Sequence, residues 1–408
     1  MNQWHAVSAG AQPRRAVAIA GAAGSGKTTL GRALARALGL PILDLDQLTN
    51  PLLDGLAAHL PGPHWLRGPA AADIRVARYS VLRSAASDIV GVGSGVVLVA
   101  PFTAELRGAE EWEELIASVA PADLRLVRID GSPELLARRR GARAEPRDRF
   151  RPQDDPTPAA VPHIAVDAAL ATGQQVQRVL RGLGVRTAID PTSPIFGAEF
   201  DAALFDVDGT IVDSTSAVLR SWGLLADEYG FDAAAVQQNH GRPARALLQQ
   251  LVPADAVESA IVRITAIETA EVAGILPIPG ASALLESLPP GGKALVTSAP
   301  RAIAAARLAA AGLTAPDVFI TLDDVQKPKP DPQPFLRAAA GLGVDPARCV
   351  VFEDAPAGVL AARAAGCRVI GVAGTGDPGE LGADLVVDAL DRVRAVQRGD
   401  SFVLEPVL

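Results

Sequence analysis

The chain has 408 residues, which is too long for one ordinary hydrophobic core and fits two domains with an inserted subdomain. Hydrophobic residues make up 49% and aromatic residues 4%, a composition typical of an alanine-rich globular protein and not of a disordered one. The formal net charge of −8 argues against a general nucleic-acid binder.

No apolar run approaches the roughly 20 residues that a membrane-spanning helix needs. We therefore expect a cytoplasmic protein with no membrane or nucleic-acid partner, and the sequence leaves its oligomeric state open. Cys349 and Cys367 are the two cysteines, too few for a disulfide scaffold or a thiolate metal site. Both lie in apolar surroundings and are expected to be reduced core residues.

Residues 1–186 alternate short apolar strands with helices. Strands are predicted over residues 16–20, 41–44, 95–100, 124–129 and 163–166, with helices over 28–38 and from the last strand to about residue 183. This alternation predicts a parallel sheet that is covered on both faces. Gly39 stands where a left-handed helix cap is favoured, and the proline-rich segment 151–162 is predicted to be a loop.

A glycine-rich loop joins the first strand to the first helix and fits the phosphate-loop pattern. Its residues are Gly21, Gly24, Ser25, Gly26, Lys27, Thr28 and Thr29. Small residues let main-chain N–H groups surround phosphates, while Lys27 would reach the terminal phosphates and Thr28 would bind Mg²⁺. We predict an ATP site here, and the alternative is a strand-to-helix turn without a ligand.

Charged residues downstream are candidates for the acceptor side of this site. Asp44 and Asp46 end the second strand and would organise Mg²⁺ and activate an acceptor hydroxyl, or else cap the helix that follows. Arg75 and Arg78 share one helix face and could hold an anionic acceptor, with solvated surface charge as the alternative. An arginine-rich run is placed like a lid over transferring phosphate, or like a solvated face: Arg138, Arg139, Arg140, Arg143, Arg147 and Arg149.

This half resembles the small-molecule P-loop kinases of the gluconate and shikimate kinase group. The resemblance rests on residues 21–28, on residues 41–46 and on the position of the arginine-rich run. It implies that Asp44 assists Mg²⁺ and that Asp46 faces the phosphoryl acceptor. No strand clearly supplies a second acid of the Walker type, and the acceptor stays unidentified.

Residues 187–199 include Asp-Pro-Thr-Ser-Pro and are predicted to be a short stiff linker. A second β-α series occupies residues 200–400, interrupted over about 214–276 by a helical stretch of the size and position of a cap. The predicted fold is therefore α/β, with two three-layer α/β/α domains built on parallel sheets. The second domain is Rossmann-like and carries the inserted helical cap.

Carboxylates follow two predicted strands of this second domain. Asp206 comes directly after residues 202–205 and is placed to attack phosphorus, while Asp208 can protonate the leaving oxygen and later deprotonate water. Glu353 and Asp354 end another strand and supply acids for Mg²⁺.

Two further fragments supply groups for a phosphate. Thr297 and Ser298 end a strand with hydroxyls able to bind phosphate or substrate oxygens. Lys327 would offset negative charge on the nucleophile and the phosphate. Ligands of open α/β sheets bind at the carboxyl ends of strands, so we expect all these fragments to form one site.

The second half resembles the haloacid dehalogenase superfamily, and within it the capped sugar-phosphate phosphatases such as the 2-deoxyglucose-6-phosphate and glycerol-3-phosphate phosphatases. The resemblance rests on residues 205–214, 239–242, 277–280 and 352–358. It implies that Asp206 is the nucleophile and Asp208 the acid/base. It further implies that Thr297 and Lys327 bind phosphate and that Asp354 binds Mg²⁺ with Asp206 and the main chain of Asp208.

Two details qualify this resemblance. His240 and Arg242 in the cap would touch the sugar or serve a structural role there. Gln326 precedes Lys327 where the family usually has glycine. Mutases share the same core, so hydrolysis in place of intramolecular transfer rests on the likeness of the cap.

The sequence thus predicts a Mg²⁺-dependent phosphatase of a small sugar or polyol phosphate, fused to an ATP-binding kinase-like domain. Two alternatives remain: a P-loop domain that only senses nucleotide, and a polynucleotide 5′-kinase and 3′-phosphatase. The acidic charge balance and the sizeable cap count against the second alternative.

Overall fold

The computed structural model describes residues 14–60, 62, 64–143, 159–232, 244–374 and 378–407. The chain divides into two compact units, Met1–Leu183 and Gly184–Leu408. The predicted cap residues His240 and Arg242, the arginines Arg147 and Arg149, and the side chain of Arg143 lie outside the described residues. Among the helices that are described, none is both long enough and apolar enough to span a membrane.

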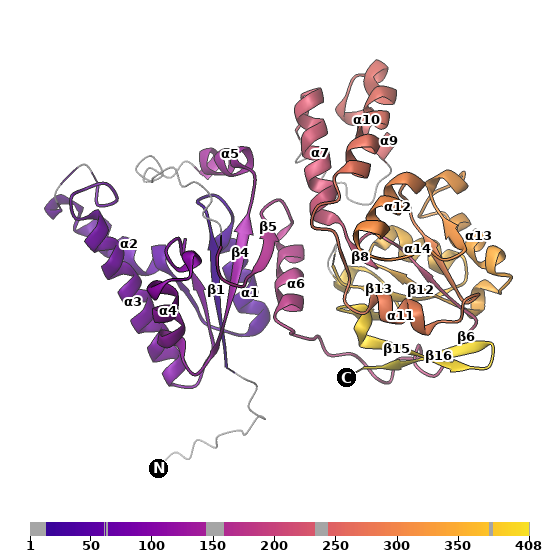
Figure 1. Ribbon diagram of the computed structural model, residues 1–408, viewed down its shortest axis with the longest axis horizontal. Coiled ribbons are helices and arrows are strands. Elements are labelled where there is room, and N and C mark those ends of the chain that lie inside the picture. The colour runs from indigo at the N-terminus through magenta and orange to yellow at the C-terminus, as the bar shows by residue number, and fades with distance from the viewer. Residues whose placement is uncertain are drawn as a thin grey trace, which may run out of the picture. The chain divides into compact units, whose positions relative to one another are not determined.

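A five-stranded parallel sheet in the order β2-β3-β1-β4-β5 forms the centre of the first unit (Figure 1). Its strands are β1 (Arg15–Gly21), β2 (Ile42–Asp44), β3 (Val96–Val99), β4 (Asp123–Asp130) and β5 (Ile164–Asp167). All five predicted strands are confirmed. Because β3 lies between β1 and β2, the strand order reverses beside β1, which is where open α/β sheets bind ligands.

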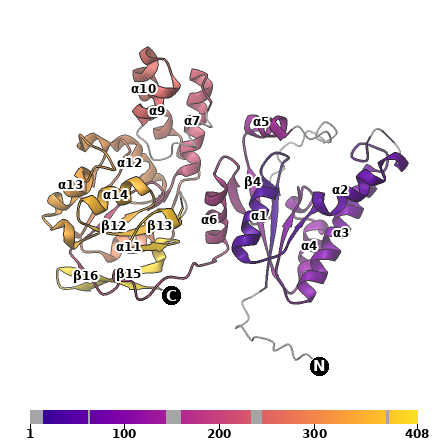
Figure 2. The same cartoon turned by 180° about the vertical axis from the view of Figure 1, so that it is seen from behind.

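Helices cover both faces of this sheet (Figures 1 and 2). On one face, α1 (Lys27–Leu38) and α6 (Thr172–Gly182) pack against Val17 and Ile19 of β1. On the other, α3 (Ala71–Gly91) and α4 (Glu110–Val119) pack against Ala16 and Ala18. Alternate β1 residues serve opposite faces because successive side chains of a strand point to opposite sides.

The remaining helical segments of the first unit are α2 (Leu45–Gly55), η1 (Ala57–His59), η2 (Glu105–Arg107) and α5 (Pro133–Arg143). Gly39 ends α1 with φ 65°, and its main-chain N–H returns to the carbonyls of Ala35 and Arg36. The predicted left-handed cap is therefore confirmed.

The second unit has a six-stranded parallel sheet in the order β11-β10-β7-β12-β13-β14. Its strands are β7 (Ala202–Phe205), β10 (Lys293–Val296), β11 (Val318–Ile320), β12 (Cys349–Glu353), β13 (Arg368–Val372) and β14 (Leu385–Val387). Helices α11 (Ala281–Ser287) and α12 (Arg301–Ala310) cover one face, and α13 (Gln333–Leu342) and α14 (Pro356–Ala364) cover the other. Both units are thus three-layer α/β/α structures, as predicted.

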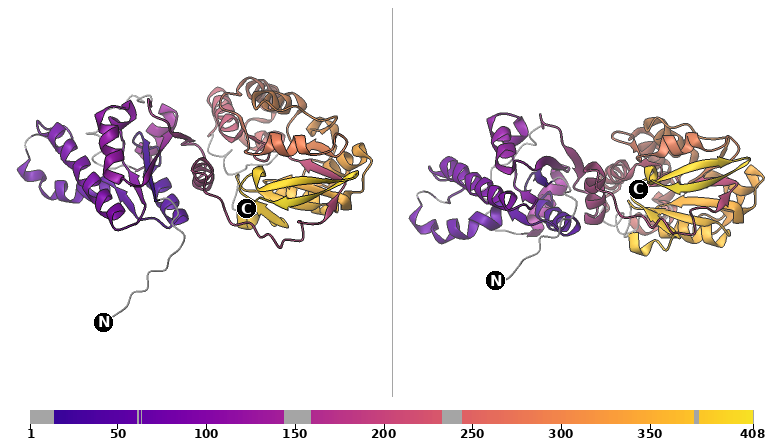
Figure 3. Two further views of the ribbon diagram at one scale, coloured as in Figure 1. Left: turned by 60° about the horizontal axis from the view of Figure 1, so that its bottom comes forward. Right: turned by 90° about the horizontal axis from the view of Figure 1, so that it is seen from below.

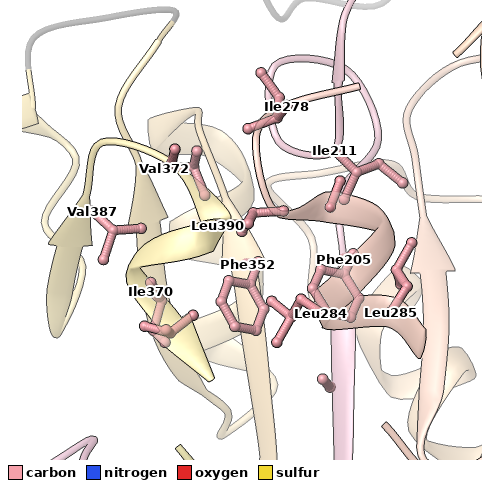
Figure 4. Close-up of a cluster of buried hydrophobic side chains, with 14 of the residues drawn as sticks. Phe205, Ile211, Ile278, Leu284, Leu285, Phe352, Ile370, Val372, Val387 and Leu390 are labelled. Atoms are coloured by element: carbon pink, nitrogen blue, oxygen red, sulfur yellow. The ribbon is translucent and has the colours of Figure 1, made fainter. Parts of the chain in front are cut away.

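Two phenylalanines fill the centre of one face of this second sheet. Phe205 of β7 and Phe352 of β12 stack with ring centroids 4.7 Å apart, and Figure 4 shows them among aliphatic side chains of α11 and β13. Each precedes an acidic residue in the sequence. This packing fixes the two strand ends from which Asp206 and Glu353 project.

Cys349 and Cys367 are both buried in the second unit and form no disulfide with each other.

The helical insertion between β7 and β10 forms a cap with its own core (Figure 1). Its helical segments are α7 (Thr215–Tyr229), α9 (Ala244–Leu251), η4 (Ala254–Ala256) and α10 (Val257–Ala270). Trp222, Leu225 and Ile264 are among the buried residues of that core. The chain enters and leaves the cap through an antiparallel pair, β8 (Val212–Asp213) with β9 (Leu276–Pro277).

The segment 187–199, predicted as a short stiff linker, is packed onto the second unit. Ile189 and Ile195 are buried in its core, and the Thr187 main-chain N–H donates to Asp388 at 2.8 Å. Arg186 forms an ion pair with Asp391. Its two isoleucines anchor this segment to the core of the second unit, so it is part of that fold.

A three-stranded antiparallel sheet closes the second unit and is absent from the sequence-based prediction. It consists of β15 (Val393–Arg398), β16 (Ser401–Pro406) and β6 (Glu199–Phe200), and Figure 3 shows the β15–β16 hairpin. Phe402 of β16 is fully buried against Phe200, with ring centroids 5.9 Å apart. Further 3-10 turns are η5 (Leu322–Asp324), η6 (Pro346–Arg348), η7 (Pro378–Glu380) and η8 (Leu390–Arg392).

We predict that Phe402→Ala lowers the free energy of unfolding by about 3–5 kcal/mol, because it removes a fully buried ring from the core. Leu360→Ala is the matched control, since Leu360 is 60% exposed on α14. Urea titration followed by circular dichroism measures both. Equal, small effects of the two substitutions would mean that the hairpin is not part of the cooperative core.

Candidate active sites

The glycine loop between β1 and α1 has a backbone that only glycine fits. Gly21, Gly24 and Gly26 have φ angles of 150°, 87° and 94°. A Cβ on Gly24 would lie 2.7 Å from the Leu136 carbonyl oxygen, and one on Gly21 would lie 2.8 Å from that of Ile129. The loop is therefore packed tightly against β4 and α5, and it leads directly into the N-terminus of α1.

The polar side chains of this loop fit a bound phosphate. Ser25 is fully buried and its Oγ has no hydrogen-bond partner among the described residues. Lys27 Nζ donates to the Ala22 carbonyl at 2.8 Å, across the loop that would hold the phosphates. Thr29 is exposed one residue further along α1. A phosphate oxygen of a bound nucleotide would accept the hydrogen bond that this buried Ser25 hydroxyl can donate.

Thr28 in the first turn of α1 contacts Asp44 at the end of β2. Thr28 Oγ1 donates to Asp44 Oδ2 at 2.7 Å, while Asp44 Oδ1 accepts the main-chain N–H groups of Asp46 and Gln47 at 2.9 and 3.3 Å. The two sequence-based alternatives for Asp44 therefore coexist: one oxygen caps α2 and the other pairs with the hydroxyl predicted to bind Mg²⁺. A hydroxyl and a carboxylate are the oxygen ligands that Mg²⁺ accepts beside a nucleotide.

Asp46 and Arg78 form the centre of a partly buried polar network. Arg78 Nη2 lies 2.6 Å from Asp46 Oδ1 and 2.9 Å from Asn50 Oδ1, and Nε donates to Thr49 Oγ1 at 2.8 Å. The guanidinium also lies over the Trp65 ring, 5.0 Å from its centroid. Arg78 is thus not the solvated surface charge that was one alternative, and its contacts fix the orientation of Asp46.

Arg75 lies one turn away and has different partners. It donates to Thr103 Oγ1 at 2.9 Å and lies 5.3 Å from the centroid of the Tyr79 ring. Glu105 is 3% exposed nearby, and burial raises the pKa of its carboxyl. No sequence motif marks Glu105, because its environment is created by the turn η2 that follows β3.

Arginines of α5 border the glycine loop. A Cβ on Gly24 would lie 3.1 Å from Cγ of Arg140, and one on Gly26 would lie 4.0 Å from Nη1 of Arg139. Burial lowers the pKa of the Arg139 guanidinium. The predicted arginine-rich run therefore begins beside the loop, with Arg138, Arg139 and Arg140 on the helix α5.

In the second unit, a buried lysine joins the two acids at the ends of β7 and β12. Lys329 Nζ lies 2.6 Å from Asp206 Oδ1, 2.8 Å from Glu353 Oε1 and 3.0 Å from the Val296 carbonyl. Lys329, Asp206 and Glu353 are 7%, 7% and 1% exposed. Burial opposes the charge of Lys329, but the two carboxylates outweigh it and raise the pKa of Lys329.

The prediction that Lys327 occupies this position is wrong in the structure. The Lys327 side chain is 73% exposed, and its Nζ is 4.0 Å from Asp331. The sequence has two Lys-Pro dipeptides two residues apart, and the local sequence does not distinguish them. The turn that leads from β11 to α13 directs Lys329 inward and leaves Lys327 outside. The Lys329 Nζ also lies 5.0 Å from the centroid of the Phe335 ring on α13.

Asp208, two residues after Asp206, has a partner on each carboxylate oxygen. Ser214 Oγ donates to Oδ1 at 2.5 Å, and Arg307 Nη1 of α12 lies 2.8 Å from Oδ2. Arg307 Nη2 lies 3.3 Å from Glu268 Oε2 of the cap helix α10. Neither Arg307 nor Glu268 is marked by a sequence motif.

The remaining predicted residues lie at the same edge of the sheet. Asp354 is 3% exposed and accepts a hydrogen bond from Thr210 Oγ1 at 3.2 Å. Thr297 follows β10, which pairs with β7, and its Oγ1 accepts the Ala299 N–H at 3.0 Å. Ser298 follows and is half-buried. The strand ends therefore bring Asp206, Thr297 and Asp354 together, as the spacing predicted.

The charge balance of this pocket fits a divalent cation. Asp206, Glu353 and Asp354 are three buried carboxylates, and the buried Lys329 contacts the first two of them. Burial raises the pKa of Asp206 well above its usual range, Lys329 opposes this, and Glu353 and Asp354 add to it. Within the described part of the chain, no three His, Cys, Asp or Glu side chains form a metal site by themselves. A cation would therefore also use main-chain or ligand oxygens.

Gly358 of α14 lies against Glu353 and leaves no space for a side chain of its own. A Cβ there would lie 1.6 Å from Oε1 of Glu353, the atom that binds Lys329. We predict that Gly358→Ala lowers the free energy of unfolding by about 2 kcal/mol or more, because Glu353 is buried and cannot move aside freely.

Gly223→Ala is the control for Gly358→Ala. Gly223 lies within α7, and a Cβ there would meet no atom within 4 Å. Alanine in the helix should raise stability by up to about 1 kcal/mol. Urea unfolding of both variants measures the contrast, and a neutral Gly358→Ala would contradict the assigned packing of Glu353.

Comparison with known proteins assigns the two units separately. Residues 200–366 match the family model described as haloacid dehalogenase-like hydrolase, and residues 17–175 match one described as an AAA domain. Hexitol phosphatase A of Escherichia coli is 40% identical over 208 residues, which cover 49% of this chain and 96% of that protein.

Two further relatives also align with about half of this chain. Glycerol-1-phosphate phosphohydrolase 2 of Saccharomyces cerevisiae is 36% identical, over 50% of this chain and 87% of that protein. Validoxylamine A 7′-phosphate phosphatase of Streptomyces hygroscopicus is 36% identical, over 50% of this chain and 100% of that protein. The first unit carries a P-loop kinase-like domain. Through its second unit, the chain belongs to the haloacid dehalogenase-like hydrolase family and is an enzyme of the phosphoric monoester hydrolase class.

Proposed function

We propose that the second unit is a Mg²⁺-dependent phosphatase of a small sugar or polyol phosphate that works through an aspartyl-phosphate on Asp206. The observation that carries this proposal is the buried contact of Lys329 with Asp206 and Glu353. Lys329 binds Oδ1 of Asp206, which directs the other oxygen, Oδ2, as the nucleophile. Asp206 follows the central strand β7, so its position is fixed on both sides by β10 and β12.

In the first step, Asp206 forms a bond to phosphorus and the ester bond to the substrate oxygen breaks. Asp208 donates a proton to that leaving oxygen, so that the product is a neutral alcohol. In the second step, Asp208 takes a proton from water, the water oxygen bonds to phosphorus, and the bond to Asp206 breaks. Thr297 binds phosphate oxygens in both steps, with Ser298 next to it, while Lys329 offsets negative charge at Asp206 through its contact with Oδ1.

Asp206, Asp354 and the main-chain carbonyl of Asp208 are the residues that would hold Mg²⁺. The ion would supply positive charge to the phosphate oxygens and to the three carboxylates of the pocket. Asp354 is oriented for this by Thr210, and Lys329 alone does not neutralise the cluster.

The relatives support a polyhydroxylated substrate. The three named proteins act, by their names, on a hexitol phosphate, on glycerol 1-phosphate and on a validoxylamine 7′-phosphate. All three are esters of small molecules rich in hydroxyl groups. A helical cap above the site suits such a substrate and would obstruct the end of a polynucleotide.

For the first unit, we propose Mg²⁺–ATP binding and phosphoryl transfer to a small hydroxyl acceptor. Two observations support the nucleotide site: the buried Ser25 hydroxyl has no hydrogen-bond partner in the described part of the chain, and Thr28 contacts Asp44. Asp46, oriented by Arg78, is the proposed base for the acceptor hydroxyl, and Arg75 lies one turn from Arg78 on α3. A domain that only senses nucleotide is the alternative.

We predict that Asp206→Asn abolishes phosphate release from every substrate in a panel of sugar, polyol and nucleotide phosphates. Lys329→Met should lower kcat by about 100-fold or more, because it removes a preorganised charge at the nucleophile. Lys327→Met, an exposed lysine in the same turn, is the matched control and should stay within about twofold of wild type. Retained turnover in Asp206→Asn would refute the nucleophile assignment.

Lys27→Met should abolish ATP binding measured by isothermal titration calorimetry, because the loop loses its only lysine toward the terminal phosphates. ATP consumption that depends on a polyol acceptor, and that is lost in Lys27→Met and in Asp46→Asn, would support kinase activity. ATP binding with no acceptor-dependent consumption across the same panel would favour the sensor alternative.

A further inference from the structure

Arg307 is a buried arginine that none of the roles above uses. Arg307 is 4% exposed and lies on α12, in the layer beneath the cap. Burial alone would lower the pKa of Arg307, but Asp208 and Glu268 outweigh burial and raise it. A buried guanidinium is costly unless partners satisfy it, so its two carboxylates are a specific arrangement and not a surface ion pair.

The two ends of the guanidinium serve different parts of the domain. Nη1 contacts Asp208 Oδ2 at 2.8 Å in the sheet domain, and Nη2 contacts Glu268 Oε2 at 3.3 Å in the cap. Glu268 also accepts a hydrogen bond from Trp222 of α7, so it is held inside the cap core. The planar fork of an arginine can hold two such acceptors at fixed angles, which a lysine cannot.

Each carboxylate oxygen of Asp208 therefore has a side-chain partner. Ser214 binds Oδ1 from the start of the cap and Arg307 binds Oδ2 from α12. The carboxylate is fixed by groups on two separate elements. Without Arg307, Oδ2 would lose its only side-chain partner described here, and the carboxylate could turn about its Cβ–Cγ bond.

We propose that Arg307 is a positioning residue for Asp208, and that Glu268 holds Arg307 in place. This inference rests on the acid/base role proposed for Asp208. Both oxygens of Asp208 accept hydrogen bonds in this arrangement, which suits the step that takes a proton from water. When Asp208 instead gives its proton to the leaving oxygen, Arg307 retains Glu268 as a partner and is not left as an uncompensated buried charge.

The test separates positioning of the acid from general stability by varying the leaving group. Single-turnover ester cleavage, with enzyme in excess, is measured for glycerol 1-phosphate and for p-nitrophenyl phosphate. An alkoxide needs a proton to leave, whereas p-nitrophenolate does not. For Arg307→Met we expect cleavage of glycerol 1-phosphate to fall about 100-fold and that of p-nitrophenyl phosphate to fall less than about tenfold.

Two weaker variants keep the test decisive if Arg307→Met does not fold. Arg307→Lys retains the charge but cannot bridge both carboxylates, and should show the same selectivity with about a tenfold loss on glycerol 1-phosphate. Glu268→Gln weakens a charge-assisted hydrogen bond and should cost about fivefold on the same substrate. Arg363→Met removes an exposed arginine paired with Asp384 and should change neither rate.

The outcomes distinguish this inference from the proposed function. Turnover that persists in Asp206→Asn would refute the phosphatase mechanism itself. If Asp206→Asn is inactive but folded Arg307 variants lose both substrates equally, or lose neither, then Arg307 does not position the acid and the inference is wrong. A selective loss on glycerol 1-phosphate, in Arg307→Lys and Glu268→Gln as well, supports it.

Discussion

The contact of Lys329 with Asp206, Glu353 and the Val296 carbonyl is the interaction on which the second unit depends. It joins the ends of three strands through one buried positive charge. Such a group is unstable in a protein interior unless every proton finds an acceptor, and here three acceptors are supplied. The surrounding packing serves this requirement: Phe205 and Phe352 fix the strands, and Gly358 leaves room for Glu353.

In both units, polar side chains meet at one edge of a parallel sheet, but the residue types differ. In the first unit, the start of α1 and the end of β2 bring a hydroxyl and a carboxylate together, Thr28 and Asp44, beside a loop whose backbone requires glycine. In the second, the ends of β7 and β12 bring carboxylates together around a lysine. A parallel sheet thus supplies the site in each case, with a glycine loop in the first unit and buried carboxylates in the second.

The strands and the residues directly after them were predictable, because a buried parallel strand is a continuous apolar run and a glycine loop has a fixed spacing. The features that depend on tertiary contacts were not predictable from the sequence. Lys327 and Lys329 are equivalent in local sequence, and only the turn before α13 separates them. Arg307 and Glu268 are distant in the chain and carry no motif. The β15–β16 hairpin pairs with β6 across almost the whole second unit, a long-range pairing that periodicity does not reveal.

The packing of residues 186–196 onto the second unit determines where the chain can be divided. Cutting at residue 200, just before the central strand β7, would remove Ile189 and Ile195 from the core, together with the contacts of Thr187 with Asp388 and of Arg186 with Asp391. The boundary between the compact units lies instead between Leu183 and Gly184. A second unit produced alone therefore has to begin at Gly184, because the stretch that looks like a tether in the sequence is a structural part of the domain it precedes.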